Sequence, residues 1–165
     1  KNDWNILKKA IEDAVNALVE YRKTEGAALE VKFREKISNI SDLLASVNQY
    51  ESARVSKIKD RIKNALVEHV GADYDTNRFE QELIYYIEKL DINEEKQRLT
   101  NHLDYFIKTI EDEKGQGKKL GFIAQEMGRE INTLGSKSNL AELQNIVVMM
   151  KDELEQIKEQ VLNVM

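Results

Sequence analysis

Apolar residues recur every three or four positions along almost the whole chain, the spacing that places them on one face of a helix. The sequence contains no proline, and no stretch alternates polar and apolar residues over the length of a strand. The pattern predicts an all-α fold, an elongated antiparallel bundle of about five helices that includes very long helical hairpin arms. All 165 residues are expected to form a single helical domain.

Five stretches carry the helical spacing. They run from about Asp3 to about Asn48, over 55–69, over 79–110, over 120–134 and over 140–161. Gly26 falls inside the first stretch, where glycine weakens a helix, so we expect either a bend or a close approach to the backbone there.

The predicted third helix is the least regular of the five. Asp75 or Thr76 is expected to cap its start. Its apolar pattern shifts at 91–93 but contains no strong breaker, so one helix is predicted to continue through the shift. The turn GQG at 115–117 is expected to end it.

Composition limits the classes of function. The chain has no cysteine, which excludes disulfides, thiolate nucleophiles and zinc–thiolate sites. It shows no signal-peptide pattern and no apolar run of membrane-spanning length, so we expect a soluble, cytoplasmic protein. The formal net charge of -5 argues against general coating of nucleic acid, and any phosphate-binding site must be a local patch.

The stretch GKKLGFIAQEMGREINTLGSK, residues 117–137, is the best candidate for such a patch. Between 114 and 137, five basic residues against two acidic ones give a local net charge of +3. The basic candidates for phosphate binding are Lys118, Lys119, Arg129 and Lys137. GQGKK precedes a predicted helix, whose first backbone N–H groups attract anions, but the spacing of a Walker motif is absent.

The same stretch contains a pair of carboxylates. Glu126 and Glu130 are one helical turn apart, so they could bind one divalent cation, or one of them could act as a general base beside a metal. The alternative is a solvated helix face on which Arg129 balances its acidic neighbours.

A second polar set lies in the predicted third helix. Arg78 and Glu82 form an i, i+4 pair, and Glu95, Arg98 and His102 share one face. His102 has no second histidine near it in the sequence. A lone histidine on a helix is more often an ordinary surface or core residue than a base or a ligand.

Together these segments resemble the YicC family, also known from its YloC members. The matching segments are YRKTEGAAL, NRFEQEL, DINEEKQRLTNHL, GKKLGFIAQEMGREINTLGSK and VVMMKDELEQIKEQVLNV. The resemblance covers essentially the whole chain, with two departures. Family members typically have Asp where this chain has Gly121, and they carry a largely β N-terminal domain, so we expect this chain to be the C-terminal helical part of a longer protein.

The resemblance implies a stress-associated, metal-dependent endoribonuclease that acts on single-stranded RNA, including small regulatory RNA, and forms hexamers. On this hypothesis Mg²⁺ or Mn²⁺ would be held by some of Glu82, Glu126 and Glu130. The implied catalytic residues are Glu126, Glu130 and His102, and the implied RNA-binding residues are Lys118, Lys119, Arg129, Lys137, Arg78 and Arg98.

Three other hypotheses remain open. The RNA 2′-hydroxyl could be the nucleophile with His102 as base, which would leave a cyclic phosphate. The chain could instead be a non-catalytic helical scaffold that binds RNA or a partner protein. It could also be only an oligomerisation module, for which long apolar stripes suffice.

Overall fold

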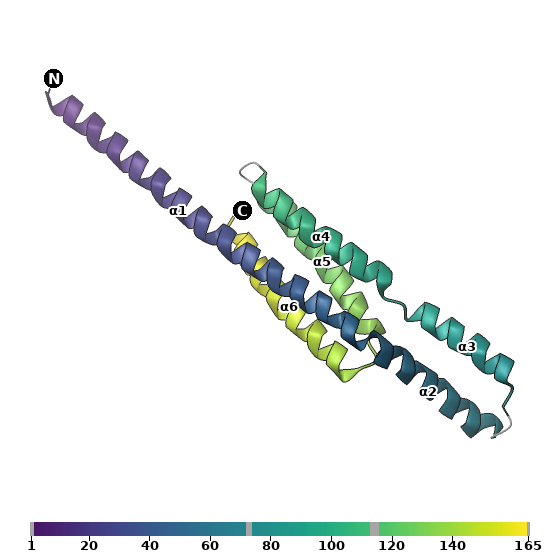
Figure 1. The fold of residues 1–165 in the computed structure, drawn as a ribbon. Helices are drawn as coiled ribbons and strands as arrows, with labels where there is room; N and C mark the ends of the chain where they lie inside the picture. Colours follow the sequence, from purple (N-terminus) through teal and green to yellow (C-terminus); the bar gives the residue numbers. More distant parts are fainter. Residues whose placement is uncertain (1, 72–73, 113–115, 165) are drawn as a thin grey trace. The chain divides into compact units, whose positions relative to one another are not determined.

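The computed structural model describes residues 2–71, 74–112 and 116–164, and within these ranges the chain is helical, without a strand (Figure 1). The elements are α1 (Asn2–Ser46), the 3₁₀-helix η1 (Val47–Tyr50), α2 (Glu51–Val70), α3 (Thr76–Lys89), α4 (Asn93–Glu111), α5 (Gly117–Lys137) and α6 (Ala141–Leu162). The all-α prediction is confirmed, with one α-helix more than expected in the described part of the chain.

The chain divides into two compact units, Lys1–Glu35 and Lys36–Met165. In the first unit α1 passes through Gly26 without interruption. A Cβ atom added at Gly26 would meet nothing within 4 Å, so no described part of the chain approaches the backbone closely there. Large apolar side chains at positions 4, 7, 11, 15 and 18 remain more than half exposed along this helix.

The main core of the second unit is built around α5, which packs against α4 on one side and α6 on the other (Figure 1). Its fully buried side chains include Leu99, Phe106, Met127, Ile131, Met150 and Ile157. Gly128 and Gly135 allow α5 and α6 to approach closely, since an added Cβ would lie 3.2 Å from Leu154 and 3.1 Å from Val147, respectively.

Helices α2 and α3 form a hairpin with a smaller core of their own, made by Ile58, Ile62 and Phe79. Gly71 ends α2 at φ 88°, a backbone conformation that favours glycine. Asp75 is the N-cap of α3, and its side chain accepts a hydrogen bond from the Asn77 N–H at 3.0 Å. The predicted cap is therefore confirmed.

The prediction of one continuous helix over 79–110 is wrong. The structure ends α3 at Lys89 and begins α4 at Asn93. Asp91 accepts a hydrogen bond from the Asn93 N–H two residues on, the pattern of an Asx turn, and Ile92 is 1% exposed. Helix α4 ends at Glu111, before the predicted GQG turn, whose Gly115 lies outside the described residues.

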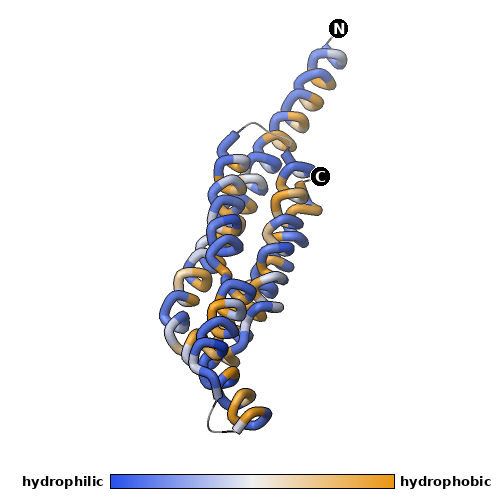
Figure 2. Tube along the Cα trace, turned by 90° about the vertical axis from the view of Figure 1, so that its right-hand side faces the viewer, coloured by the Kyte–Doolittle hydropathy of each residue, from blue (hydrophilic) through white to orange (hydrophobic). Residues whose placement is uncertain are grey.

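Apolar residues form stripes on these helices, and polar residues cover the rest of each surface (Figure 2). In the described ranges, no helix combines the length and the apolar character needed to cross a membrane.

Candidate functional site

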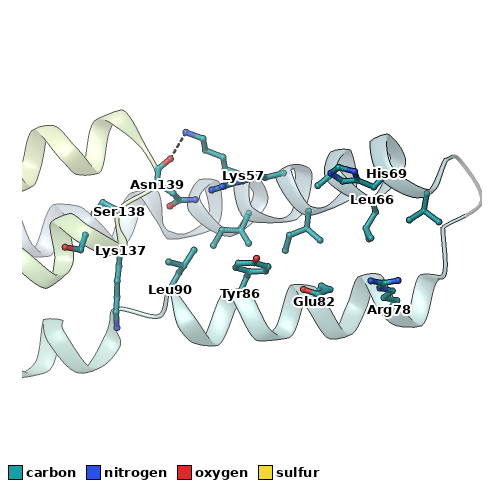
Figure 3. Close-up of a pocket in the computed structure, with 16 residues that line it drawn as sticks. Lys57, Leu66, His69, Arg78, Glu82, Tyr86, Leu90, Lys137, Ser138 and Asn139 are labelled. Carbon is teal, nitrogen blue, oxygen red and sulfur yellow. Dashed lines mark hydrogen bonds between the residues drawn. The ribbon is translucent and has the colours of Figure 1, made fainter.

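A cleft of about 710 Å³ lies between α2 and α3 in the second unit (Figure 3). Arg78, Glu82 and Tyr86 point from α3 toward α2. Residues 136–139, at the turn between α5 and α6, line one end of the cleft.

Much of the lining follows from a spacing of four residues on each helix, which keeps side chains on one face. On α2 these positions are Lys57, Arg61, Ala65 and His69, and on α3 they are Arg78, Glu82, Tyr86 and Leu90. The small core of the hairpin contributes Ile58, Ile62 and Leu66, which give the cleft an apolar base.

The cleft is positively charged in a protein with a net charge of -5. Lys57, Arg61, Arg78 and Lys137 line it against one carboxylate, Glu82. Lys57 Nζ donates a hydrogen bond to the Asn139 carbonyl at 2.5 Å. A cleft with an excess of one sign of charge concentrates ligands of the opposite sign, so this one suits an anion.

Two arginine side chains in the cleft are available to bind an anion. Arg61 and Arg78 are exposed, and in the described part of the chain neither makes a hydrogen bond or an ion pair. An arginine guanidinium presents several N–H donors in a fixed fork that matches phosphate.

A separate network of ion pairs joins α4 to α5. Arg98 Nε donates to Glu130 Oε1 at 2.9 Å, and Lys137 Nζ donates to Glu95 Oε1 at 2.7 Å. Arg98 also contacts Glu94 and lies 3.8 Å from Glu95. The side chains of Glu130 and Glu95 are 7% and 5% exposed, so both carboxylates are buried with their charges paired.

The pKa directions agree with this pairing. The hydrogen bond to Glu130 raises the pKa of Arg98, although desolvation opposes the shift. Burial alone would raise the pKa of Glu95, but the hydrogen bonds from Lys137 and the backbone and the charges of Lys137 and Arg98 together lower it. Glu95 is therefore held ionised by its partners.

The structure does not bring the three predicted metal ligands together. Glu82 lies in the α2–α3 cleft, Glu126 pairs with Arg129 at 3.5 Å, and Glu130 is held by Arg98. Across the described ranges, no three His, Asp or Glu side chains are grouped closely enough to hold a metal ion. These carboxylates do not fit one shared metal site in this chain.

The other predicted residues lie in several places. Arg78 and Lys137 line the cleft, although Lys137 also binds Glu95 and the Asp91 carbonyl. His102 is half-buried on α4 and does not line the cleft. Lys118 is exposed near the start of α5, and the Lys119 ammonium lies 4.9 Å from the centre of the Tyr105 ring.

Sequence reasoning missed Lys57, Arg61, His69 and Tyr86 as site residues. The four-residue spacing of Lys57, Arg61 and His69 was the available signal. That spacing shows a shared face, but it does not show that α3 packs beside this face and closes a cleft.

The fold and the cleft define an all-α domain with a basic cleft between two paired helices, suited to a polyanion. The family described as "Endoribonuclease YicC-like, C-terminal" matches residues 47–165. The chain belongs to this family.

Two curated relatives extend the similarity to almost the whole chain. The chain is 34% identical to the "Probable endoribonuclease YicC" of Clostridioides difficile (strain 630) over 163 residues, which are 98% of this chain and 56% of the relative. It is 29% identical to the protein of the same name from Haemophilus influenzae (strain ATCC 51907 / DSM 11121 / KW20 / Rd) over 157 residues, 95% of this chain and 54% of the relative. The chain thus spans about half the length of the curated relatives it matches.

Proposed function

We propose that the full-length protein is an endoribonuclease and that this chain binds the RNA in the α2–α3 cleft. The observation that carries the proposal is the pair of exposed arginines without ion-pair partners in the described chain, Arg61 on α2 and Arg78 on α3. Between two such side chains, successive phosphates of one strand can be bound from both walls of the cleft. The proposed substrate is single-stranded RNA, including small regulatory RNA, and the proposed compartment is the cytoplasm.

Two mechanisms for cleaving the RNA phosphodiester are proposed as alternatives. The first route uses a metal ion, as the family resemblance implies. In this proposal Glu82 would hold Mg²⁺ or Mn²⁺, because it is the one predicted ligand that lines the cleft. Mg²⁺ is often held by one or two carboxylates together with substrate phosphates, and it would supply charge neutralisation at the phosphodiester.

The second route uses the RNA 2′-hydroxyl as nucleophile. It needs a base near the bound strand, and the cleft contains His69 on α2, whereas His102 lies elsewhere on α4. Hydrolysis assisted by a metal leaves no cyclic phosphate, but attack by the 2′-hydroxyl does. Identifying the product termini therefore separates the two routes.

A second candidate function is a non-catalytic scaffold that presents RNA to another nuclease. The observation that favours it is the lack of any three grouped His, Asp or Glu side chains in the described part of the chain. In either function we propose that the protein assembles with copies of itself, as hexamers if the family resemblance holds. The exposed apolar positions of α1 supply a surface for this assembly.

The cleft proposal is tested by the double variant Arg61→Ala with Arg78→Ala in the full-length protein. We expect weaker binding of a labelled RNA strand and a shallower dependence of log affinity on log salt, by about 0.7 for each RNA phosphate that the variant no longer binds. The matched control is Lys59→Ala with Lys63→Ala, which removes the same charge from the opposite face of α2. Unchanged affinity and salt dependence in the arginine variant would overturn the proposal.

A further inference from the structure

Two exposed tyrosines adjoin the basic cleft. Tyr86 lines the cleft and is 39% exposed, and Tyr85 beside it is 56% exposed. Their ring centroids lie 5.3 Å apart with an interplanar angle of 81°, an edge-to-face pair. The two rings therefore support each other and still present aromatic surface to solvent.

A basic residue lies on each side of this pair along α3, with the Glu82 carboxylate between Arg78 and Tyr86. Arg78 precedes Tyr86 by two helical turns on the same face. The Lys89 ammonium lies 5.9 Å from the centre of the Tyr85 ring. Helix α3 thus carries a strip with a cation beyond each end of the aromatic pair, and with one carboxylate, Glu82, on the same face as Arg78 and Tyr86.

A strip of this kind has the chemistry of a site for an unpaired nucleotide. Cations bind backbone phosphates, and exposed aromatic rings stack on bases of any sequence. Bases in a duplex are already stacked and paired, so they are not free to reach such a ring. The cleft also has an apolar base, but Arg61 and Arg78, which have no ion-pair partner in the described part of the chain, favour a phosphate backbone over an apolar peptide helix.

Resting on the proposed RNA binding in the cleft, we infer that the Tyr85–Tyr86 pair stacks on an unpaired base whose phosphate is held by the cleft arginines. The pair is a specificity determinant in this role, because it makes binding depend on an accessible base as well as on charge. The preference of RNA binding for single strands over duplexes would then come from these two residues of α3.

The test compares Tyr86→Leu with Tyr86→Phe in the full-length protein, with fluorescence anisotropy of a labelled single-stranded RNA as the measurement. Leucine removes the ring, and we expect about tenfold weaker binding, as removal of one base–aromatic stack implies. Phenylalanine keeps the ring and should bind about as tightly as the parent. Ile84→Ala, at an exposed apolar position on the same helix that does not line the cleft, is the control for altered helix packing.

A strand with abasic sites separates stacking from charge. The parent protein should bind it about tenfold more weakly than the intact strand, and Tyr86→Leu should bind both strands equally. If Tyr86→Leu keeps full affinity while Arg61→Ala with Arg78→Ala binds more weakly, the stacking inference is wrong and the cleft proposal stands. If the arginine variant also binds normally, the cleft proposal itself is wrong.

Discussion

The resemblance to the YicC family leads us to expect Asp where this chain has Gly121, and the structure shows what a side chain would meet there. An added Cβ would lie 3.7 Å from Val161 Cγ1, an ordinary van der Waals contact. This position of α5 therefore has room for a β-carbon, so crowding around the backbone does not exclude a side chain there.

We predict that Gly121→Ala stabilises the protein by about 0.5–1 kcal/mol, since glycine inside a helix costs conformational entropy that alanine does not. The corresponding rise in melting temperature is about 2 °C for a domain of this size. Thermal unfolding followed by circular dichroism measures it.

Gly135→Ala is the matched comparison on the same helix. Its Cβ would lie only 3.1 Å from Val147 Cγ1, so it should give a smaller gain or a net destabilisation. An equal gain in stability at both positions would show that Val147 on α6 moves away from the new methyl group at Gly135 at little cost.

At the scale of helices, periodicity predicts where apolar faces lie but not where every helix ends. At the break between α3 and α4, the Asp91 carboxylate accepts a hydrogen bond from the Asn93 N–H, and Ile92 is buried, which fixes the chain direction between the two helices. Neither Asp91 nor Ile92 is a helix breaker by itself. The break was therefore missed, whereas a cap at Asp75 or Thr76 was predicted and the structure has Asp75 as the cap.

The pairing of α4 with α5 should depend on pH through Glu95. The pKa of Glu95 is lower in the folded chain than in the unfolded chain, where it is about 4.3. Ionised Glu95 therefore stabilises the fold fully above a pH of about 4.3, and this stabilisation is lost as the pH falls through the folded pKa. We predict that Lys137→Met costs about 1–3 kcal/mol at pH 7, because it leaves Glu95 buried without its closest partner.

Urea unfolding at several pH values measures this effect. The cost of Lys137→Met should shrink as Glu95 becomes protonated in acid. Lys158→Met, which breaks an exposed pair with Glu155, should cost less than about 0.5 kcal/mol at any pH. A pH-independent cost for Lys137→Met would mean that its aliphatic packing is what matters.

At the scale of the molecule, the sequence named several residues that line the cleft, but it did not predict that they meet between α2 and α3. Arg78, Glu82 and Lys137 were candidates, and all three line the cleft. Their gathering depends on which helices pair and on the turn at 136–139, which the periodicity of each helix does not contain. The family resemblance and the local charge favoured α5 as the RNA-binding surface. The cleft that contains Arg61 and Arg78 lies instead between α2 and α3.

The apolar stripe of α1 in the first unit is the surface that the proposed self-assembly would use. Trp4, Leu7, Ile11 and Leu18 recur on one helix face and are at least half exposed. A long helix with such a stripe gains most of its stability when the stripe is covered, and an equal stripe on a second copy is a complementary surface. We predict that Ile11→Glu lowers the assembly state of the protein.

Size-exclusion chromatography with light scattering measures the assembly, and Trp4 adds a local probe as the one tryptophan of this chain. Burial of the stripe should shift its emission to the blue, and Ile11→Glu should reverse the shift. Asn16→Glu places the same charge on the opposite face of α1 and should leave both readings unchanged. If Ile11→Glu keeps the parental mass while Trp4 becomes exposed, the stripe is covered within one molecule instead of by a second copy.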